Sequence, residues 1–307
     1  MMRIIAAFQL CWIFAAPVAA APEQPGFYQG IISYAHGHIL GRRSRPELAI
    51  QVMDANRVDK VVVFAKRGAS DEDVMKWHAA FLDRVIPAIG FQNNMWRNGA
   101  PEFMDEVRRK AASGKYYWLG EASVRGKIGG RENSAPDDKK LKELLDIAAR
   151  YHLPVTIHHN PLVEENGVWR HTEEYARFIE ATLAHNPRAT IVWTHWCGLS
   201  TPTDIRRLLK RFPNLHCGLA WIRKIRTSLP NPVVDENARF MPGWKDLIEA
   251  YPDRFLMGVD HGAKKGQLKK YPRWIKSIRT ALGGLSPKAA RKVATENFHR
   301  LLQLGQK

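Results

Sequence analysis

Residues 60–83 read KVVVFAKRGASDEDVMKWHAAFLD, and this stretch contains the unit that decides the fold. The run Lys60–Phe64 is apolar after its first residue, as is typical of a strand buried on both faces of a parallel sheet. After a polar connection, Asp71–Asp83 has the apolar spacing of an amphipathic helix. The stretch therefore predicts one strand followed by one helix.

The same alternation continues on both sides of this unit. Further apolar runs indicate strands at Gly30–Tyr34, Val85–Phe91, Tyr116–Gly120, Val155–Ile157, Thr190–Thr194, Leu215–Leu219 and Phe255–Val259. Helical patterns lie at Glu102–Ser113, Asp137–Tyr151, Thr172–His185, Thr203–Phe212, Gly243–Tyr251 and Pro287–Leu304. We expect an α/β fold, a single (β/α)8 TIM barrel of parallel strands with outer helices. An open doubly wound sheet is the alternative, but no glycine-rich dinucleotide motif follows an early strand.

The first residues predict export. Arg3 precedes an uncharged apolar stretch, Ile4–Val18, and the small residues Ala19–Ala21 follow, as in a secretory signal peptide. The apolar stretch is shorter than the roughly 20 residues of a membrane span and contains Pro17. We expect residues 1–20 to be cleaved, residues 21–307 to form one domain without a membrane span, and the mature protein to be periplasmic or secreted.

Composition excludes some classes of protein. With 45% hydrophobic residues in a chain of 307, the sequence is neither disordered nor a multispanning membrane protein. Its 47 Lys and Arg against 30 Asp and Glu suggest an anionic partner, although for the charge alone a basic solvated surface is the favoured explanation. No nucleic-acid motif is present, and no nucleic-acid partner is expected. Cys197 and Cys217, the cysteines left after processing, make no disulfide framework; one bridge between them in an oxidising compartment stays open as the less favoured outcome.

Histidines and carboxylates gather where the predicted strands end. His36 and His38 follow the first strand, His158 and His195 follow two later ones, and Glu121 and Asp260 follow two more. Residues at i and i+2 of an extended segment point to the same side, so the first two imidazoles would project together. Each residue alone has an ordinary structural explanation. Together, at the end of a barrel where active sites form, they predict a metal site.

The motifs around these residues resemble the amidohydrolase superfamily, and within it the amidohydrolase-related branch. They are His-Gly-His at 36–38, Gly-Glu-Ala-Ser at 120–123, Leu-Pro-Val-Thr-Ile-His at 153–158, Thr-His-Trp-Cys-Gly at 194–198, Arg-Phe-Leu-Met-Gly-Val-Asp at 254–260 and Asn-Phe-His-Arg-Leu-Leu at 297–302. The resemblance extends from about Ile31 to Leu304. It implies a metal-dependent hydrolase with a TIM-barrel fold and one or two divalent ions, for which zinc is the favoured metal.

The resemblance also implies a role for each position. The metal ligands would be His36, His38, Glu121, His158, His195 and Asp260, with Glu121 in the place of the bridging ligand. Asp260 and His195 would be catalytic: Asp260 as a further ligand or the base that deprotonates a metal-bound water, and His195, with His158, as a ligand of a second metal or, as in one-metal relatives, of the substrate that it polarises. Tyr34 and Val259 stand where relatives often have Asp and Ser. These two departures leave the surroundings of the ligands open.

Cations and tryptophans near the same strand ends suggest the substrate. Arg43, Lys66, Arg67, Trp196 and Trp221 are candidate substrate-binding residues, and residues 264–279 contain seven cations and no acid. We expect a small anionic substrate with a hydrolysed ester, lactone, amide or phosphoester bond. The long connection Ala220–Met241 is interpreted as a lid. A homo-oligomer, a decarboxylase or hydratase, and a silent barrel that only binds its ligand all remain open alternatives.

Overall fold

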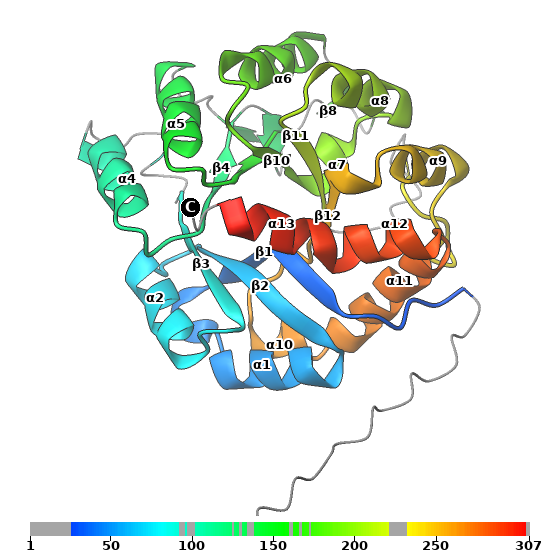
Figure 1. Ribbon diagram of the computed structural model, residues 1–307, viewed down its shortest axis with the longest axis horizontal. Coiled ribbons are helices and arrows are strands. Elements are labelled where there is room, and N and C mark those ends of the chain that lie inside the picture. The colour runs from blue at the N-terminus through cyan, green and yellow to red at the C-terminus, as the bar shows by residue number, and fades with distance from the viewer. Residues whose placement is uncertain are drawn as a thin grey trace, which may run out of the picture.

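The computed structural model describes residues 26–91, 96, 102–124, 126–128, 131–133, 138–159, 162–165, 168–171, 173–220 and 232–304. Eight strands form one sheet in the order β1-β2-β3-β4-β7-β10-β11-β12 (Figure 1). They are β1 (Ile32–Ile39), β2 (Val58–Ala65), β3 (Val85–Ile89), β4 (Trp118–Ser123), β7 (Val155–His158), β10 (Ile191–Trp193), β11 (Leu215–Leu219) and β12 (Phe255–Met257). All seven adjacent pairs are parallel, which confirms the predicted barrel.

The barrel is nearly closed between its first and last strands. An isolated parallel bridge joins His38 to Gly262, beyond the end of β12. The amides of Val259 and Asp260 both donate to the His36 carbonyl oxygen at 3.2 Å, and the His38 amide donates to the His261 carbonyl oxygen at 3.0 Å. Backbone hydrogen bonds therefore draw β1 and the segment after β12 together.

Helices surround the strands, as the alternation predicts (Figure 1). They are α1 (Pro46–Ala55), α2 (Asp71–Ala80), α4 (Glu102–Ala112), α5 (Asp138–Arg150), α6 (Glu173–His185), α7 (Thr194–Leu199), α8 (Pro202–Arg211), α9 (Pro242–Ala250), α10 (Lys265–Leu268), α11 (Tyr271–Gly283), α12 (Pro287–Arg291) and α13 (Asn297–Leu304). Two short 3-10 helices lie at Gly41–Arg43 and Pro252–Arg254. Among the described residues, no helix is long and apolar enough to cross a membrane.

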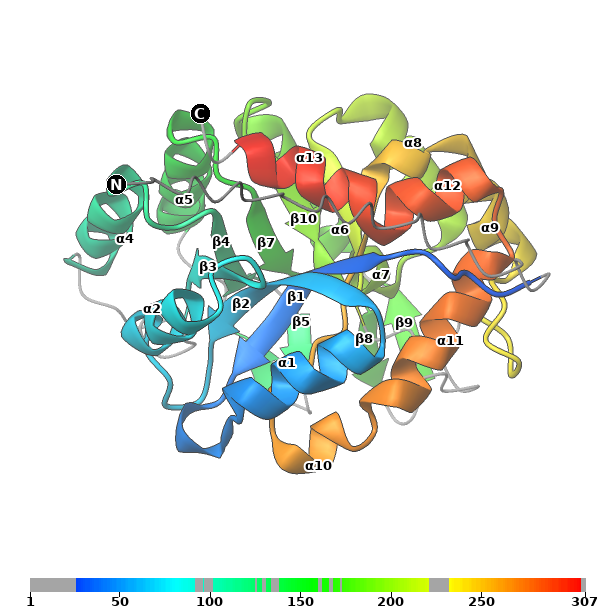
Figure 2. The same ribbon diagram turned by 60° about the horizontal axis from the view of Figure 1, so that its bottom comes forward.

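The last helix covers one end of the barrel. Phe298 and Leu301 of α13 pack in one buried cluster with Val62, Trp118 and Leu256 of the strands. Two antiparallel hairpins, β5 (Gly126–Ile128) with β6 (Arg131–Asn133) and β8 (Leu162–Glu165) with β9 (Val168–His171), lie away from α13 (Figure 2). They follow β4 and β7, so they belong to the end at which the site residues gather.

The structure corrects several boundaries. β1 continues to Ile39, so His36 and His38 lie within this strand and not after it. The pattern 287–304 contains α12, a five-residue π-helix (Lys292–Glu296) and α13 in place of one helix. Helices α1 and α11 and both hairpins were not predicted. The signal peptide (1–20) and residues 221–231 of the expected lid lie outside the described residues.

The structure decides the question of the two cysteines that the sequence left open, and the less favoured outcome holds: Cys197 and Cys217 form a disulfide. Cys197 lies in α7 and Cys217 in β11, and their Cα atoms are 5.2 Å apart. Twenty positions separate them in the sequence. Only the pairing of β10 with β11, which places Trp193 beside Cys217, makes them neighbours.

Candidate metal centre

The structure brings all six predicted ligands together. His36 and His38 come from β1, Glu121 from β4, His158 from the last position of β7, His195 from α7 directly after β10, and Asp260 from the segment after β12. Their donor atoms form two groups that share Glu121, and within each group the atoms lie within 4.8 Å of one another. The parallel strands explain this convergence, because their carboxyl ends meet at the same end of the barrel.

The first group has the dimensions of a tetrahedral metal site. Nε2 of His38 lies 3.1 Å from Nε2 of His36 and 2.9 Å from Oδ1 of Asp260. Oε2 of Glu121 lies 3.7 Å from His36 Nε2 and 3.6 Å from His38 Nε2, and His36 Nε2 lies 3.5 Å from Asp260 Oδ1. Ligand atoms about 2.0–2.1 Å from a tetrahedral ion are about 3.3 Å apart. The four donors therefore fit one cation.

The second group uses the other oxygen of Glu121. Oε1 lies 2.8 Å from Nδ1 of His158 and 3.3 Å from Nε2 of His195. The two imidazole rings meet edge to face with centroids 4.6 Å apart. One oxygen of Glu121 faces each histidine pair, so this carboxylate is placed to bridge two cations.

The buried surroundings favour the protonation states that a cation needs. Burial lowers the pKa of His38, and it lowers the pKa of His195 to about 4. Burial alone would raise the pKa of Glu121 and Asp260, but the nearby cationic and imidazole groups outweigh it and both values fall below their ordinary range. Neutral imidazoles and ionised carboxylates are the forms that bind metals.

Local irregularities direct the ligands toward the centre. The pairing of β1 with β2 shifts register between Tyr34 and Gly37, and Ala35 and His36 both face the barrel interior. Such bulges commonly redirect a side chain beside an active site. The Nδ1 atom of His36 forms a 2.8 Å hydrogen bond with the Thr194 hydroxyl, which turns its Nε2 atom toward the other ligands. Sequence reasoning missed Thr194, although it stands directly before His195.

Gly120 allows β4 to present Glu121. Its φ is +123°, a conformation that residues with a side chain rarely adopt. A Cβ atom at this position would lie 2.5 Å from the Thr156 carbonyl oxygen of β7. The chain therefore needs glycine directly before the shared ligand.

The predicted substrate residues have different surroundings. Lys66, directly after β2, forms a 3.0 Å ion pair with Oε2 of Glu121, so it belongs to the centre itself. Burial opposes the charge of Lys66, but Glu121 outweighs it and raises the pKa of the lysine. Arg43 and Arg67 are exposed on the loops after β1 and β2. These loops are adjacent, because a Cβ atom at Gly41 would lie 3.1 Å from the carbonyl oxygen of Gly68.

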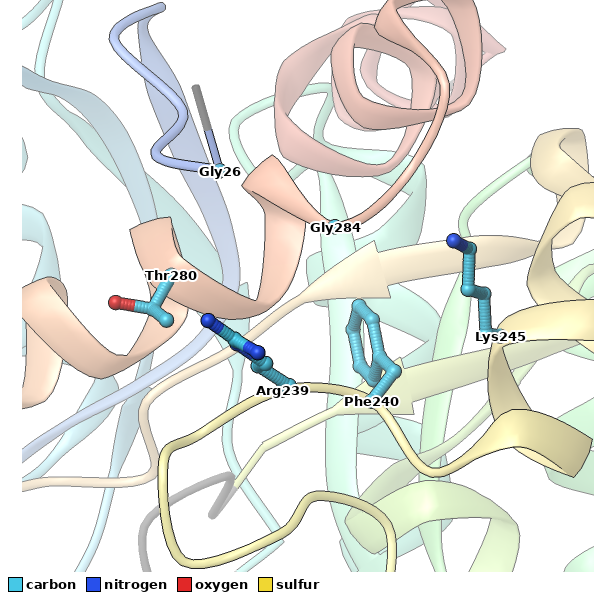
Figure 3. A pocket seen from close by; sticks show the side chains of 6 residues that line it. All are labelled: Gly26, Arg239, Phe240, Lys245, Thr280 and Gly284. Atoms are coloured by element: carbon cyan, nitrogen blue, oxygen red, sulfur yellow. The ribbon is translucent and has the colours of Figure 1, made fainter. Parts of the chain in front are cut away.

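The aromatic candidates do not line the centre in the part of the chain that the structure describes. Trp196 is only 2% exposed and packs edge to face against Phe240 and Trp244. Trp221 lies outside the described residues. A cavity of about 310 Å³ lies elsewhere, lined by Gly26, Arg239, Phe240, Lys245, Thr280 and Gly284 (Figure 3). None of the six ligands lines it.

Comparisons with known proteins concern the fold. No protein-family profile and no curated protein matches the chain by sequence. Among solved structures, a TatD homologue from Escherichia coli is 15% identical over 88% of this chain and 97% of its own, with a TM-score of 0.57. Enamidase, described as a member of the amidohydrolase superfamily, is 13% identical over 91% of this chain and 67% of its own, with a TM-score of 0.50.

A third solved structure is an amidohydrolase from Burkholderia multivorans with bound zinc. It is 12% identical over 89% of this chain and 99% of its own, with a TM-score of 0.49. At these identities the comparisons bear on the fold alone. The comparisons confirm the predicted fold: the chain has the same barrel fold as the TatD homologue and enamidase.

Proposed function

We propose that this protein is a metal-dependent hydrolase of the amidohydrolase type. One observation carries the proposal: two donor groups meet at the mouth of the barrel and share Glu121, one oxygen toward each. Two carboxylates and four imidazoles packed this closely are costly to bury unless a cation binds among them. Their donor atoms and spacings fit one or two divalent ions, and zinc is the metal that such nitrogen and oxygen ligands favour.

In this proposal the residues divide the work. His36, His38 and Asp260 would hold one ion, His158 and His195 would hold a second, and Glu121 would offer one carboxylate oxygen to each. When bound there, a divalent cation would supply a lowered pKa for a water molecule and polarisation of the bond to be cleaved. Asp260, ionised in its folded surroundings, accepts the proton of the attacking water and passes it to the leaving group.

The charge of the centre favours an anionic substrate. The two carboxylates of the candidate ligands and the ammonium group of Lys66 have a net charge of −1 when the imidazoles are neutral. One divalent ion would change the net charge to +1, and two ions would change it to +3. Arg43 and Arg67 add positive charge on the adjacent loops after β1 and β2. A positive field at a recessed site concentrates anions and guides their approach. We therefore propose a small anionic ester, lactone, amide or phosphoester as the substrate.

We further propose that the protein acts outside the cytoplasm, in the periplasm or as a secreted protein. Residues 1–20 have the pattern of a signal peptide. The Cys197–Cys217 disulfide supports the same location, because disulfides persist in oxidising compartments and are rare in the cytosol.

The test combines metal loading with a substrate panel. The purified protein is stripped with a chelator, reloaded separately with Zn²⁺ and Mn²⁺, and assayed on matched anionic and neutral esters, lactones, amides and phosphoesters. We expect turnover only after reloading, and its loss in His36→Ala and His38→Ala. The control is His299→Ala, which changes a half-exposed surface histidine paired with Asp59 and should keep full activity.

Other results would select the alternatives. Metal binding without turnover of any panel member would refute hydrolysis and leave a silent binding barrel. Release of CO₂ from carboxylic acids, or addition of water to a double bond, would identify a non-hydrolytic relative. Full activity of the chelated protein would exclude the metal-dependent mechanism.

A further inference from the structure

The residue that completes the second donor group lies in an unusual turn. His195, Trp196, Cys197 and Gly198 have φ values of 55°, 59°, 52° and 67°, so four consecutive residues are left-handed. For residues other than glycine this conformation is unfavourable, and it normally occurs one residue at a time. Three of these four residues have side chains. The surrounding structure must therefore hold the turn in place.

Two contacts hold it. Cys197 is joined covalently to Cys217 of β11, and both residues are fully buried. Trp196 is buried between Phe240 and Trp244, with ring centroids 6.0 and 5.8 Å away. Gly218, next to Cys217, lets β11 approach the start of the turn, because a Cβ atom there would lie 3.3 Å from the Thr194 Cα atom. The turn is thus fixed to the neighbouring strand on one side and to aromatic side chains on the other.

The turn determines where His195 lies. It reverses the chain immediately after β10, and Nε2 of His195 comes within 3.3 Å of Oε1 of Glu121. Its ring lies 4.6 Å from that of His158 and 5.5 Å from that of His36. If residues 195–198 relaxed to right-handed or extended conformations, the imidazole would leave this position. The first donor group contains no residue of the turn.

We propose that the Cys197–Cys217 disulfide is a positioning device that holds His195 in the second metal-binding group. The proposal rests on the proposed function, in that a second cation binds between Glu121, His158 and His195. The location of the crosslink supports this role over a general stabilising one. β10 and β11 are already paired beside it, Trp193 opposite Cys217, so the strand arrangement does not depend on the bond. The bond instead holds Cys197, a residue of the left-handed turn, at a fixed position on β11.

The experiment compares two ways of removing the disulfide. Cys197→Ala/Cys217→Ala leaves a side chain at a left-handed position, where relaxation is favoured. Cys197→Gly/Cys217→Ala places there the residue that adopts a left-handed φ without steric cost. Each chelated variant is titrated with Zn²⁺ against a chromophoric chelator that resolves the two binding steps. Leu209→Ala, which opens a cavity in α8 remote from the ligands, is the control for lost stability.

We expect the first Zn²⁺ to bind all variants with affinity within about twofold of wild type, since His36, His38 and Asp260 lie outside the turn, and Thr194, which orients His36, directly follows β10 and precedes the left-handed residues. The second should bind the alanine double variant at least tenfold more weakly, about 1.4 kcal/mol. The glycine double variant should lie between it and wild type. Leu209→Ala should have a lower Tm and both affinities unchanged, because a loss of general stability does not move His195.

Each contrary result is decisive. Equal second-ion affinity in wild type and both double variants would overturn the positioning role while leaving the two-ion centre intact. Double variants that are both unfolded by circular dichroism would show that the crosslink serves the whole fold, and would also overturn it. Wild-type protein that binds fewer than two Zn²⁺ ions would refute the two-ion centre itself, and the inference with it.

Discussion

Replacement of Glu121 by glutamine tests the centre most directly. Glutamine keeps the shape of the side chain but removes the negative charge that both donor groups and Lys66 share. At 3.0 Å the attraction between the Lys66 ammonium and the Glu121 carboxylate is about 5.5 kcal/mol for an effective dielectric constant of about 20. The Lys66 side chain is 35% exposed, and water screens the pair, so we expect a loss of about 1–3 kcal/mol in the metal-free protein.

The loaded protein should change more. Because Glu121 supplies one oxygen to each group, we expect Glu121→Gln to hold at most one Zn²⁺ where wild type holds two. Elemental analysis after reloading gives the metal count, and urea unfolding in excess chelator gives the stability of the metal-free form. Glu296→Gln is the matched control, since Glu296 is half exposed beside Arg291 and should change stability by less than about 0.5 kcal/mol. A metal count and a stability equal to wild type in Glu121→Gln would remove Glu121 from the centre.

Three further changes have defined outcomes. Gly120→Ala should cost about 2–4 kcal/mol in urea unfolding, because its Cβ atom would lie 2.5 Å from the Thr156 carbonyl oxygen; unchanged stability would contradict the close approach. Burial and two nearby arginines lower the pKa of His216 to about 3, so the unfolded chain takes up a proton below pH 6.5 that the folded chain refuses. The contribution of His216 to stability should therefore fall by about 2 kcal/mol from pH 6.5 to 4.5, in addition to the falls from His195 and His261. Wild type and His216→Gln should differ in slope by this amount, which unfolding at each pH measures. Arg43→Ala and Arg67→Ala should lower kcat/KM for an anionic substrate about two- to tenfold at low salt and leave a neutral one unchanged; equal effects on both would separate these arginines from substrate charge.

The sequence was sufficient for the barrel because its signals are local. Helix α5, for example, was predicted at Asp137–Tyr151 and occupies Asp138–Arg150. Its apolar residues recur at helical spacing along one face, and this pattern can be recognised within the segment itself. Helix α11 was missed because the many cations in residues 264–279 were interpreted only as positive charge that attracts an anionic substrate. In the structure Ile275, Ile278 and Leu282 nevertheless form a buried face on it. A dense polar pattern can conceal an amphipathic helix.

The convergence of the six candidate ligands could also be predicted, because residues at the ends of parallel strands meet at one end of the barrel. The orientation of their side chains could not be predicted. The register shift in β1, the bond from Thr194 to His36 and the two-sided role of Glu121 depend on contacts between distant segments. The same holds for the disulfide and for Lys66, which sequence reasoning placed with the substrate and the structure places on Glu121.

The junction between the first and last strands has a consequence for handling the protein. Bridges from His38 to Gly262 and from Ser44 to Lys264, together with a few backbone hydrogen bonds, close the barrel there. His36 and His38 lie on one side of this junction and Asp260 lies on the other. The proposed cation, held by all three residues, would cross-link the two sides of this junction. Without it, β1 would be the strand closest to becoming a free edge, on which another chain can pair. If the proposed cation binds here, the chelated protein should aggregate more readily than the metal-loaded protein, which light scattering from the two forms measures.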